Sequence, residues 1–154
     1  MTTPFIPYEI SNIAIQYSIP LIFISGLVSL IYKYKILALM QLTVYMTSIL
    51  HWSHIEKYSM IRYLDMTAAI ASFLYATYLA TYVIPNIKWV WYYSMGISIG
   101  VFTINEFVFY IGIEYCDCFT YMAYQSVIIH MIFLHIMPTL TSMYCIIIGE
   151  NLVK

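Results

Sequence analysis

Two histidines, the only arginine and an aspartate fall within fifteen positions of the segment 47–69, TSILHWSHIEKYSMIRYLDMTAA. These residues are His51, His54, Arg62 and Asp65. Histidine exchanges protons near neutral pH and is a common metal ligand. The surrounding sequence is apolar, and ionisable residues in such segments usually face a cavity, a partner or a pathway. They are therefore the first candidates for a functional site.

Hydroxyl groups accompany two of the four histidines at helical spacing. Thr47 precedes His51 by four residues, and Ser126 precedes His130 by four. Residues four apart share one helix face, so each hydroxyl can hydrogen-bond the imidazole or hold a metal-bound water. His54 lies three residues after His51 and shares its face, or it is an interfacial histidine at the edge of a loop.

The last two histidines have a less regular spacing. His130 and His135 are five residues apart, which places them about 140° apart on a regular α-helix. They converge only if the helix is distorted. Pro138 removes the hydrogen bond to the carbonyl of Leu134 and could supply that distortion.

The composition indicates a membrane protein. The chain has 154 residues, of which 63% are hydrophobic and 8% charged, whereas soluble domains carry about 25% charged residues. Net charge is −1 and no basic run occurs, so we expect the lipid bilayer as the partner and no nucleic-acid binding. Three cysteines do not form a disulfide framework; Cys116 and Cys118 are either a metal-binding C-x-C step or unpaired thiols.

Five apolar stretches are long enough to cross a bilayer, which takes about 20 residues. Pro20 is expected to kink the first stretch, and Pro138 interrupts the last. The short connections favour an antiparallel bundle. The fold class is therefore predicted to be all-α, with residues 1–154 forming one integral membrane domain of about five spans: 11–32, 36–54, 60–84, 88–112 and 119–148.

The order of the spans brings polar groups of four helices into one half of the bilayer. His51 and Asp65 flank the 55–59 loop and lie roughly 5–10 Å below its surface, at about 1.5 Å per residue. Span four reaches the same surface, so Glu106 has a similar depth. Span five departs from that surface, which puts His130 about 16 Å down. Glu106 either belongs to one polar site with these histidines or has a structural role.

Aromatic and basic residues mark the expected span ends. Tyrosine and tryptophan near these ends predict an interfacial belt of Tyr32, Tyr34, Trp52, Trp89, Trp91, Tyr92 and Tyr93. Four lysines (Lys33, Lys35, Lys88 and Lys154) fall on one side of the five-span arrangement, and Lys57 and Arg62 fall on the other. Basic loops favour the cytoplasm, so we expect a cytoplasmic C-terminus.

Three short segments, TSILH, RYLD and HMIFLH, resemble the CREST superfamily of membrane proteins, which includes alkaline ceramidases and the adiponectin and progestin receptors. Its pattern is S-x-x-x-H, then D, then H-x-x-x-H on the last helix. In that family three histidines bind zinc, and a zinc-bound water hydrolyses an amide in a lipid.

The resemblance implies roles for five residues of this chain. His51, His130 and His135 would be zinc ligands, Thr47 would stand for the serine, and Asp65 would be the catalytic aspartate. The chain departs from the pattern in three ways. It has about five spans where the family has seven, a threonine where the family has serine, and H-x-x-x-x-H where the family has H-x-x-x-H. The segment TSILHW…R…LD also resembles small multi-pass membrane proteins of large DNA viruses and protists. This second resemblance implies no activity.

Three functions remain open at this point. The first is a membrane-embedded His/Asp site, zinc-dependent and hydrolysing a lipid amide or ester; zinc with three imidazoles and water leaves an open catalytic position. The second is a b-type haem protein with His51 and His130 as axial ligands. The third is a structural or interaction protein whose polar groups fix helix packing.

Overall fold

The protein is an all-helical bundle in the computed structural model, which describes residues 8–53, 60–115 and 119–153. No strand occurs among these residues. Two segments are π-helical and one is a 3-10 helix, Pro85–Ile87. The α-helices are α1 Tyr8–Tyr17, α2 Ile19–Ile31, α3 Lys35–Ser53, α4 Met60–Tyr78, α5 Lys88–Tyr115, α6 Phe119–His130 and α7 Met137–Val153.

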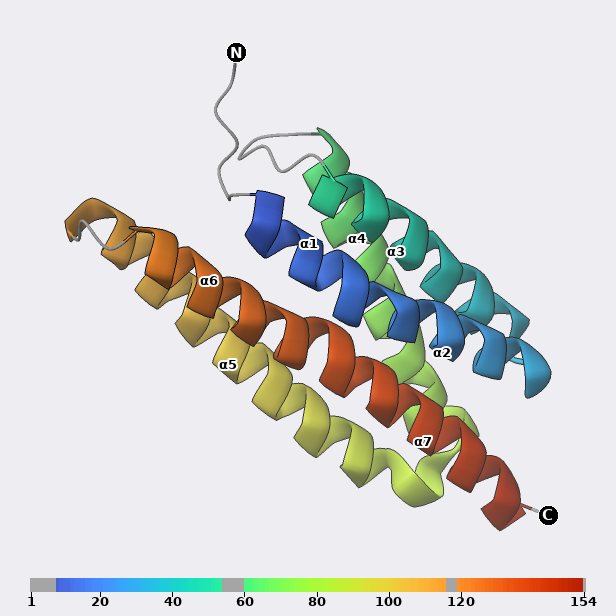
Figure 1. The fold of residues 1–154 in the computed structure, drawn as a ribbon. Helices are drawn as coiled ribbons and strands as arrows, with labels where there is room; N and C mark the ends of the chain where they lie inside the picture. Colours follow the sequence, from blue (N-terminus) through green and yellow to red (C-terminus); the bar gives the residue numbers. More distant parts are fainter. Residues whose placement is uncertain (1–7, 54–59, 116–118, 154) are drawn as a thin grey trace.

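The first expected span is divided at Ser18 into α1 and α2. Pro20 stands at the start of α2 and lacks an N–H. The Ser18 N–H still donates to Ala14 O at 3.1 Å, and the Leu21 N–H donates to Ser18 O at 3.2 Å, which makes a tighter turn of the 3-10 kind. The two helices still follow one another across the bundle (Figure 1), and they form one apolar stretch over Ser11–Ile31.

Helix α4 stands apart from most of the bundle. Figure 1 shows α1 and α2 alongside α3, α5 beside α6 and α7, and α4 crossing behind them. Helix α4 packs along α3 and meets α5 near its C-terminal end, where Phe73 and Thr77 contact Trp91 and the π-helical segment Leu79–Val83 follows. Within α4, all of whose residues are described, Ala76 alone is buried. This arrangement leaves space between α4 and the α5–α7 layer.

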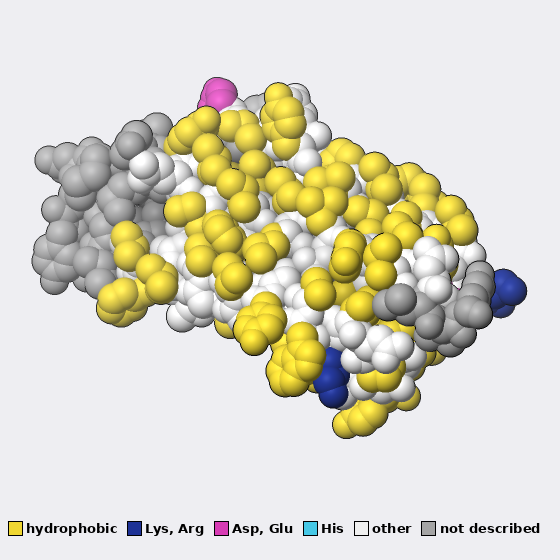
Figure 2. All heavy atoms as spheres, turned by 90° about the horizontal axis from the view of Figure 1, so that it is seen from below, with side chains coloured by type: hydrophobic (Ala, Val, Ile, Leu, Met, Phe, Trp, Pro, Cys, Tyr) yellow, Lys and Arg dark blue, Asp and Glu magenta, His cyan; other side chains and the backbone are white. Residues whose placement is uncertain are grey.

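Four helical stretches are long and apolar enough to cross a membrane: Ser11–Ile31, Lys35–Ser53, Met60–Val83 and Tyr124–Asn151. They correspond to four of the five expected spans. Helix α5 is longer, with 28 residues, but it is not among these four in the described part of the chain, so its crossing remains a prediction. Hydrophobic side chains cover most of the face in Figure 2, and the few visible charged ones lie near its rim.

Two tryptophans assigned to the interfacial belt are in fact core residues. Trp52 and Trp91 are each only 3% exposed. Trp91 packs with Leu79 and Ile146 in one hydrophobic cluster, and its Nε1 donates to Thr77 Oγ1 at 2.9 Å. The belt prediction is therefore wrong for these two residues, because both side chains turn toward neighbouring helices. Trp89, at 61% exposed, does face outward.

Close packing at Gly149 leads to a stability prediction. A Cβ atom at Gly149 would lie 3.0 Å from Ile84 Cγ2 and 3.1 Å from Ile84 Cβ, whereas one at Gly96 would meet nothing within 4 Å. Overpacking costs about 1–3 kcal/mol, so Gly149→Ala should lower the thermal midpoint of the detergent-solubilised protein. Gly96→Ala is the control and should leave it unchanged or higher. Equal midpoints would show that α7 does not approach Ile84 this closely.

Candidate functional site

A π-helical segment brings His130 and His135 together. Met131–Ile136 forms π-helix, and the Met137 N–H bonds to Ile132 O, five residues back. Pro138 follows, with no N–H to offer the carbonyl of Leu134. Residues five apart lie close to the same face in a π turn, where bonds run from i to i+5. The two imidazole centroids are 5.2 Å apart, so the expected distortion is present and has the expected effect.

A hydrogen bond to Ser18 orients His135. Ser18 Oγ lies 2.8 Å from Ala14 O and 3.1 Å from His135 Nδ1. The hydroxyl has one hydrogen, and its bond to the carbonyl uses it. In the neutral ring, Nδ1 then carries the proton and donates to Ser18, and Nε2 keeps its lone pair. The break between α1 and α2 thus places the serine that sets the tautomer of a buried histidine.

Two hydroxyl groups of α3 bind Asp65 of α4. Thr47 Oγ1 and Ser48 Oγ donate to the same carboxylate oxygen, Asp65 Oδ1, at 2.8 and 2.7 Å. The spacing of Thr47 and His51 allowed the hydroxyl to bond the imidazole or to hold a metal-bound water, and its shortest hydrogen bond in the structure goes to Asp65. Charge-assisted bonds of this kind are stronger than neutral ones, which explains the preference. They also join α4 to α3 at the depth of the candidate site.

Trp52 lies among the three histidines. Its ring centroid is 5.3 Å from that of His51, 5.4 Å from His130 and 6.2 Å from His135. Two buried atoms here have no hydrogen-bond partner, His51 Nδ1 and Trp52 Nε1. The indole therefore contacts His51 as well as the pair that the π-helical segment brings together.

The described residues do not complete a three-histidine zinc site in this arrangement. No three side chains of His, Cys, Asp or Glu in the described part of the chain lie close enough to share one metal ion. His130 and His135 lie together, and the Trp52 ring contacts both His51 and His130. Zinc binding stays a prediction.

Asp65, His130 and His135 all line one cavity of about 480 Å³. This volume is within the range of roughly 300–1,000 Å³ for small-molecule sites. The cavity occupies the space between α4 and the layer of α5, α6 and α7, with α2 and α3 as its floor. Ser48 adds a hydroxyl to the polar end. Most of the remaining wall is apolar and includes Ile70, Phe73, Leu74, Trp91, Ile99, Phe102 and Leu134.

Several other candidates lie outside the described residues. His54, Cys116 and Cys118 belong to undescribed segments, and the side chain of Glu106 is likewise not described although its backbone belongs to α5. Their predicted roles stay untested. Arg62 is within electrostatic range of His51 and His130.

Sequence reasoning missed three residues of the site: Ser18, Ser48 and Trp52. Ser48 adjoins Thr47, so it carried a usable signal, because either hydroxyl of a Thr-Ser pair can meet a carboxylate on the next helix. Ser18 was less predictable, and its only distinguishing feature in the sequence is its position two residues before Pro20. Nothing in its sequence context distinguished Trp52 from a tryptophan at the membrane interface.

Comparisons with protein-family models, with curated proteins and with solved structures find no match to this chain.

Proposed function

We propose that this chain is an integral membrane protein that takes a lipid into the large cavity and hydrolyses an amide or ester bond in it. The observation that carries the proposal is the lining of that cavity: Asp65, His130 and His135 share it with an extended apolar wall. Polar groups inside a membrane are costly and usually functional. An apolar tail would lie along the apolar wall with its amide or ester beside the polar end.

The side chains supply groups for proton transfer. The lone pair on Nε2 of His135 can accept a proton from a water that attacks the carbonyl carbon, and the imidazolium can return that proton to the departing nitrogen or oxygen. Asp65 lies within electrostatic range of His135 and of His51, and its carboxylate stabilises positive charge on these rings. General acid–base catalysis of this kind contributes about 10²–10⁴-fold.

The resemblance to the CREST superfamily supports the same reaction and adds zinc as the expected cofactor. Its proposed ligands are His51, His130 and His135, with Thr47 and Asp65 as the serine and aspartate equivalents. Zinc content therefore belongs in the same experiment as hydrolysis, because the two results separate a metal hydrolase from acid–base chemistry of the side chains alone.

The test is hydrolysis of fluorogenic lipid amides and esters by detergent-purified protein, with metal content measured by mass spectrometry. We expect His135→Ala to lower the rate about 10²–10⁴-fold. The control is Ser98→Ala, which removes a buried hydroxyl of α5 that does not line this cavity. Its rate should equal the wild-type rate.

The metal analysis has three informative outcomes. Near-stoichiometric zinc, lost in both His51→Ala and His130→Ala, would identify one shared zinc site. Hydrolysis without zinc would assign the reaction to the side chains. A folded protein without hydrolysis would overturn the proposal. In that case iron with a Soret band would indicate the haem protein, and the absence of any metal would indicate a structural protein.

A further inference from the structure

A row of polar side chains on α7 leads away from the candidate site toward the opposite membrane surface. Thr139, Ser142 and Glu150 follow His135 by four, seven and fifteen residues. Positions at this spacing lie on one face of a helix. Thr139 and Ser142 are buried, at 9% and 6% exposed. The row is therefore enclosed by the bundle as far as Ser142.

Side chains from α2 and α3 complete this row. Ser29 Oγ donates to Gln41 Oε1 at 2.7 Å, and Gln41 Nε2 donates to Ser142 Oγ at 3.2 Å. At the outer end, the hydroxyl of Tyr34 donates to Glu150 Oε1 at 2.7 Å. Tyr34 lies in the turn between α2 and α3, so this last bond joins that turn to the end of α7.

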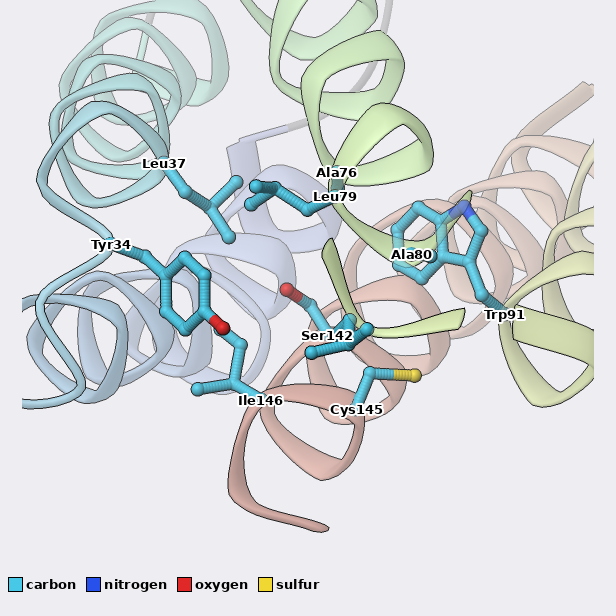
Figure 3. Close-up of a pocket in the computed structure, with 10 residues that line it drawn as sticks. Tyr34, Leu37, Ala76, Leu79, Ala80, Trp91, Ser142, Cys145 and Ile146 are labelled. Carbon is cyan, nitrogen blue, oxygen red and sulfur yellow. The ribbon is translucent and has the colours of Figure 1, made fainter. Parts of the chain in front are cut away.

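A second, small cavity lies between Ser142 and Tyr34. It has a volume of about 10 Å³, which is close to the minimum that holds one water molecule. Ala76, Trp91 and Ser142 line both this small cavity and the large one. Figure 3 shows Tyr34 and Ser142 on the wall of the small cavity, with their hydroxyl groups toward its interior. The two cavities therefore adjoin at Ser142, and Tyr34 on the far wall of the small one donates to Glu150.

We propose that this row is a path for water and protons between the large cavity and the membrane surface at the C-terminal end of α7. The hydroxyl groups of Thr139, Ser142 and Tyr34 both donate and accept, as a relay requires. Glu150 is half-buried near the C-terminal end of α7, and its hydrogen bond to Tyr34 closes the path. The path does not depend on the hydrolysis proposed above, although it would serve that reaction by supplying water.

The chemistry of Tyr34 suits a closing contact. Burial and the hydrogen bond to Glu150 both raise the pKa of the Tyr34 hydroxyl above its usual value of 10.0. The phenol therefore keeps its proton throughout the neutral range and remains a donor to the carboxylate. Opening requires that this bond break, which Tyr34→Phe accomplishes with little change in side-chain volume.

The test measures access of water-borne reagent to Ser142→Cys. The three native cysteines are first removed by Cys116→Ser, Cys118→Ser and Cys145→Ala. The protein is placed in liposomes, and sulfonatoethyl methanethiosulfonate is added only on the side of the C-terminus, located with a protease-sensitive tag. We expect slow labelling when Tyr34 is present and a rate about fivefold higher with Tyr34→Phe, the effect of losing one hydrogen bond.

The matched control is Ser98→Cys in the same background. Ser98 is fully buried on α5 and lines neither cavity, so Tyr34→Phe should leave its labelling unchanged. An equal increase at both cysteines would indicate general loosening and overturn the path. Labelling of Ser142→Cys that ignores Tyr34→Phe would overturn it too, as would labelling only from the opposite side of the membrane.

Discussion

Replacing Asp65 with alanine is expected to loosen α4 from α3 and to abolish hydrolysis. The carboxylate accepts hydrogen bonds from Thr47 and Ser48 at 2.8 and 2.7 Å. Hydrogen bonds between membrane helices average about 0.6 kcal/mol and reach about 1.7 kcal/mol, so loss of both should cost roughly 1–3 kcal/mol. The Trp91 Nε1–Thr77 Oγ1 bond at 2.9 Å holds the other end of α4 to α5, and the Asp65 pair attaches α4 to α3. Thermal unfolding in detergent measures the change.

The control for this change is Thr67→Ala on the same helix. The Thr67 hydroxyl donates to Tyr63 O of its own helix at 2.7 Å and is exposed, so its removal should leave the thermal midpoint within error. Asp65→Asn separates attachment from chemistry, because an amide oxygen still accepts hydrogen bonds but carries no charge. Stability near wild type with hydrolysis reduced about 10²-fold or more is expected. Full hydrolysis by Asp65→Asn would remove Asp65 from the reaction.

The position of the site in the bundle followed from the order of the spans. His51 and Asp65 flank one connection, and His130 lies on the span that starts from the same surface, so their convergence depended only on how often the chain crosses the bundle. The structure places Asp65, His130 and His135 on one cavity. Short-range geometry was also predictable where covalent structure forces it, as at Pro138, whose missing N–H favours the π-helical segment.

Tertiary contacts were less accessible to sequence reasoning. Trp52 reads as an interfacial tryptophan because it is close to the end of α3, yet its indole is buried among the three histidines. The separation of α4 from the α5–α7 layer left no signal either, because lipid-facing and core-facing positions are both apolar in a membrane protein. The cavity depends on that separation, so it became visible only in three dimensions.

Hydrolysis should be lost in Pro138→Ala although the protein becomes no less stable. Alanine restores an N–H at position 138, which can bond to the carbonyl of Leu134 and let an α-helix continue through residues 131–136. His130 and His135 would then lie about 140° apart, instead of with ring centroids at 5.2 Å. A proline inside a helix costs about 3 kcal/mol, so its removal should hold or raise the thermal midpoint.

The contrast between activity and stability makes this variant informative. Most damaging substitutions lower both, whereas Pro138→Ala should lower only hydrolysis, to the level of His135→Ala. Pro85→Ala is the matched control, since Pro85 is exposed at the start of the 3-10 helix and does not line the large cavity, and its rate should equal that of wild type. Wild-type hydrolysis by Pro138→Ala would mean either that the π turn persists without the proline or that the reaction does not need the two histidines on one face. Circular dichroism cannot separate these cases, but adding His130→Ala can, because it removes activity only if the paired imidazoles take part.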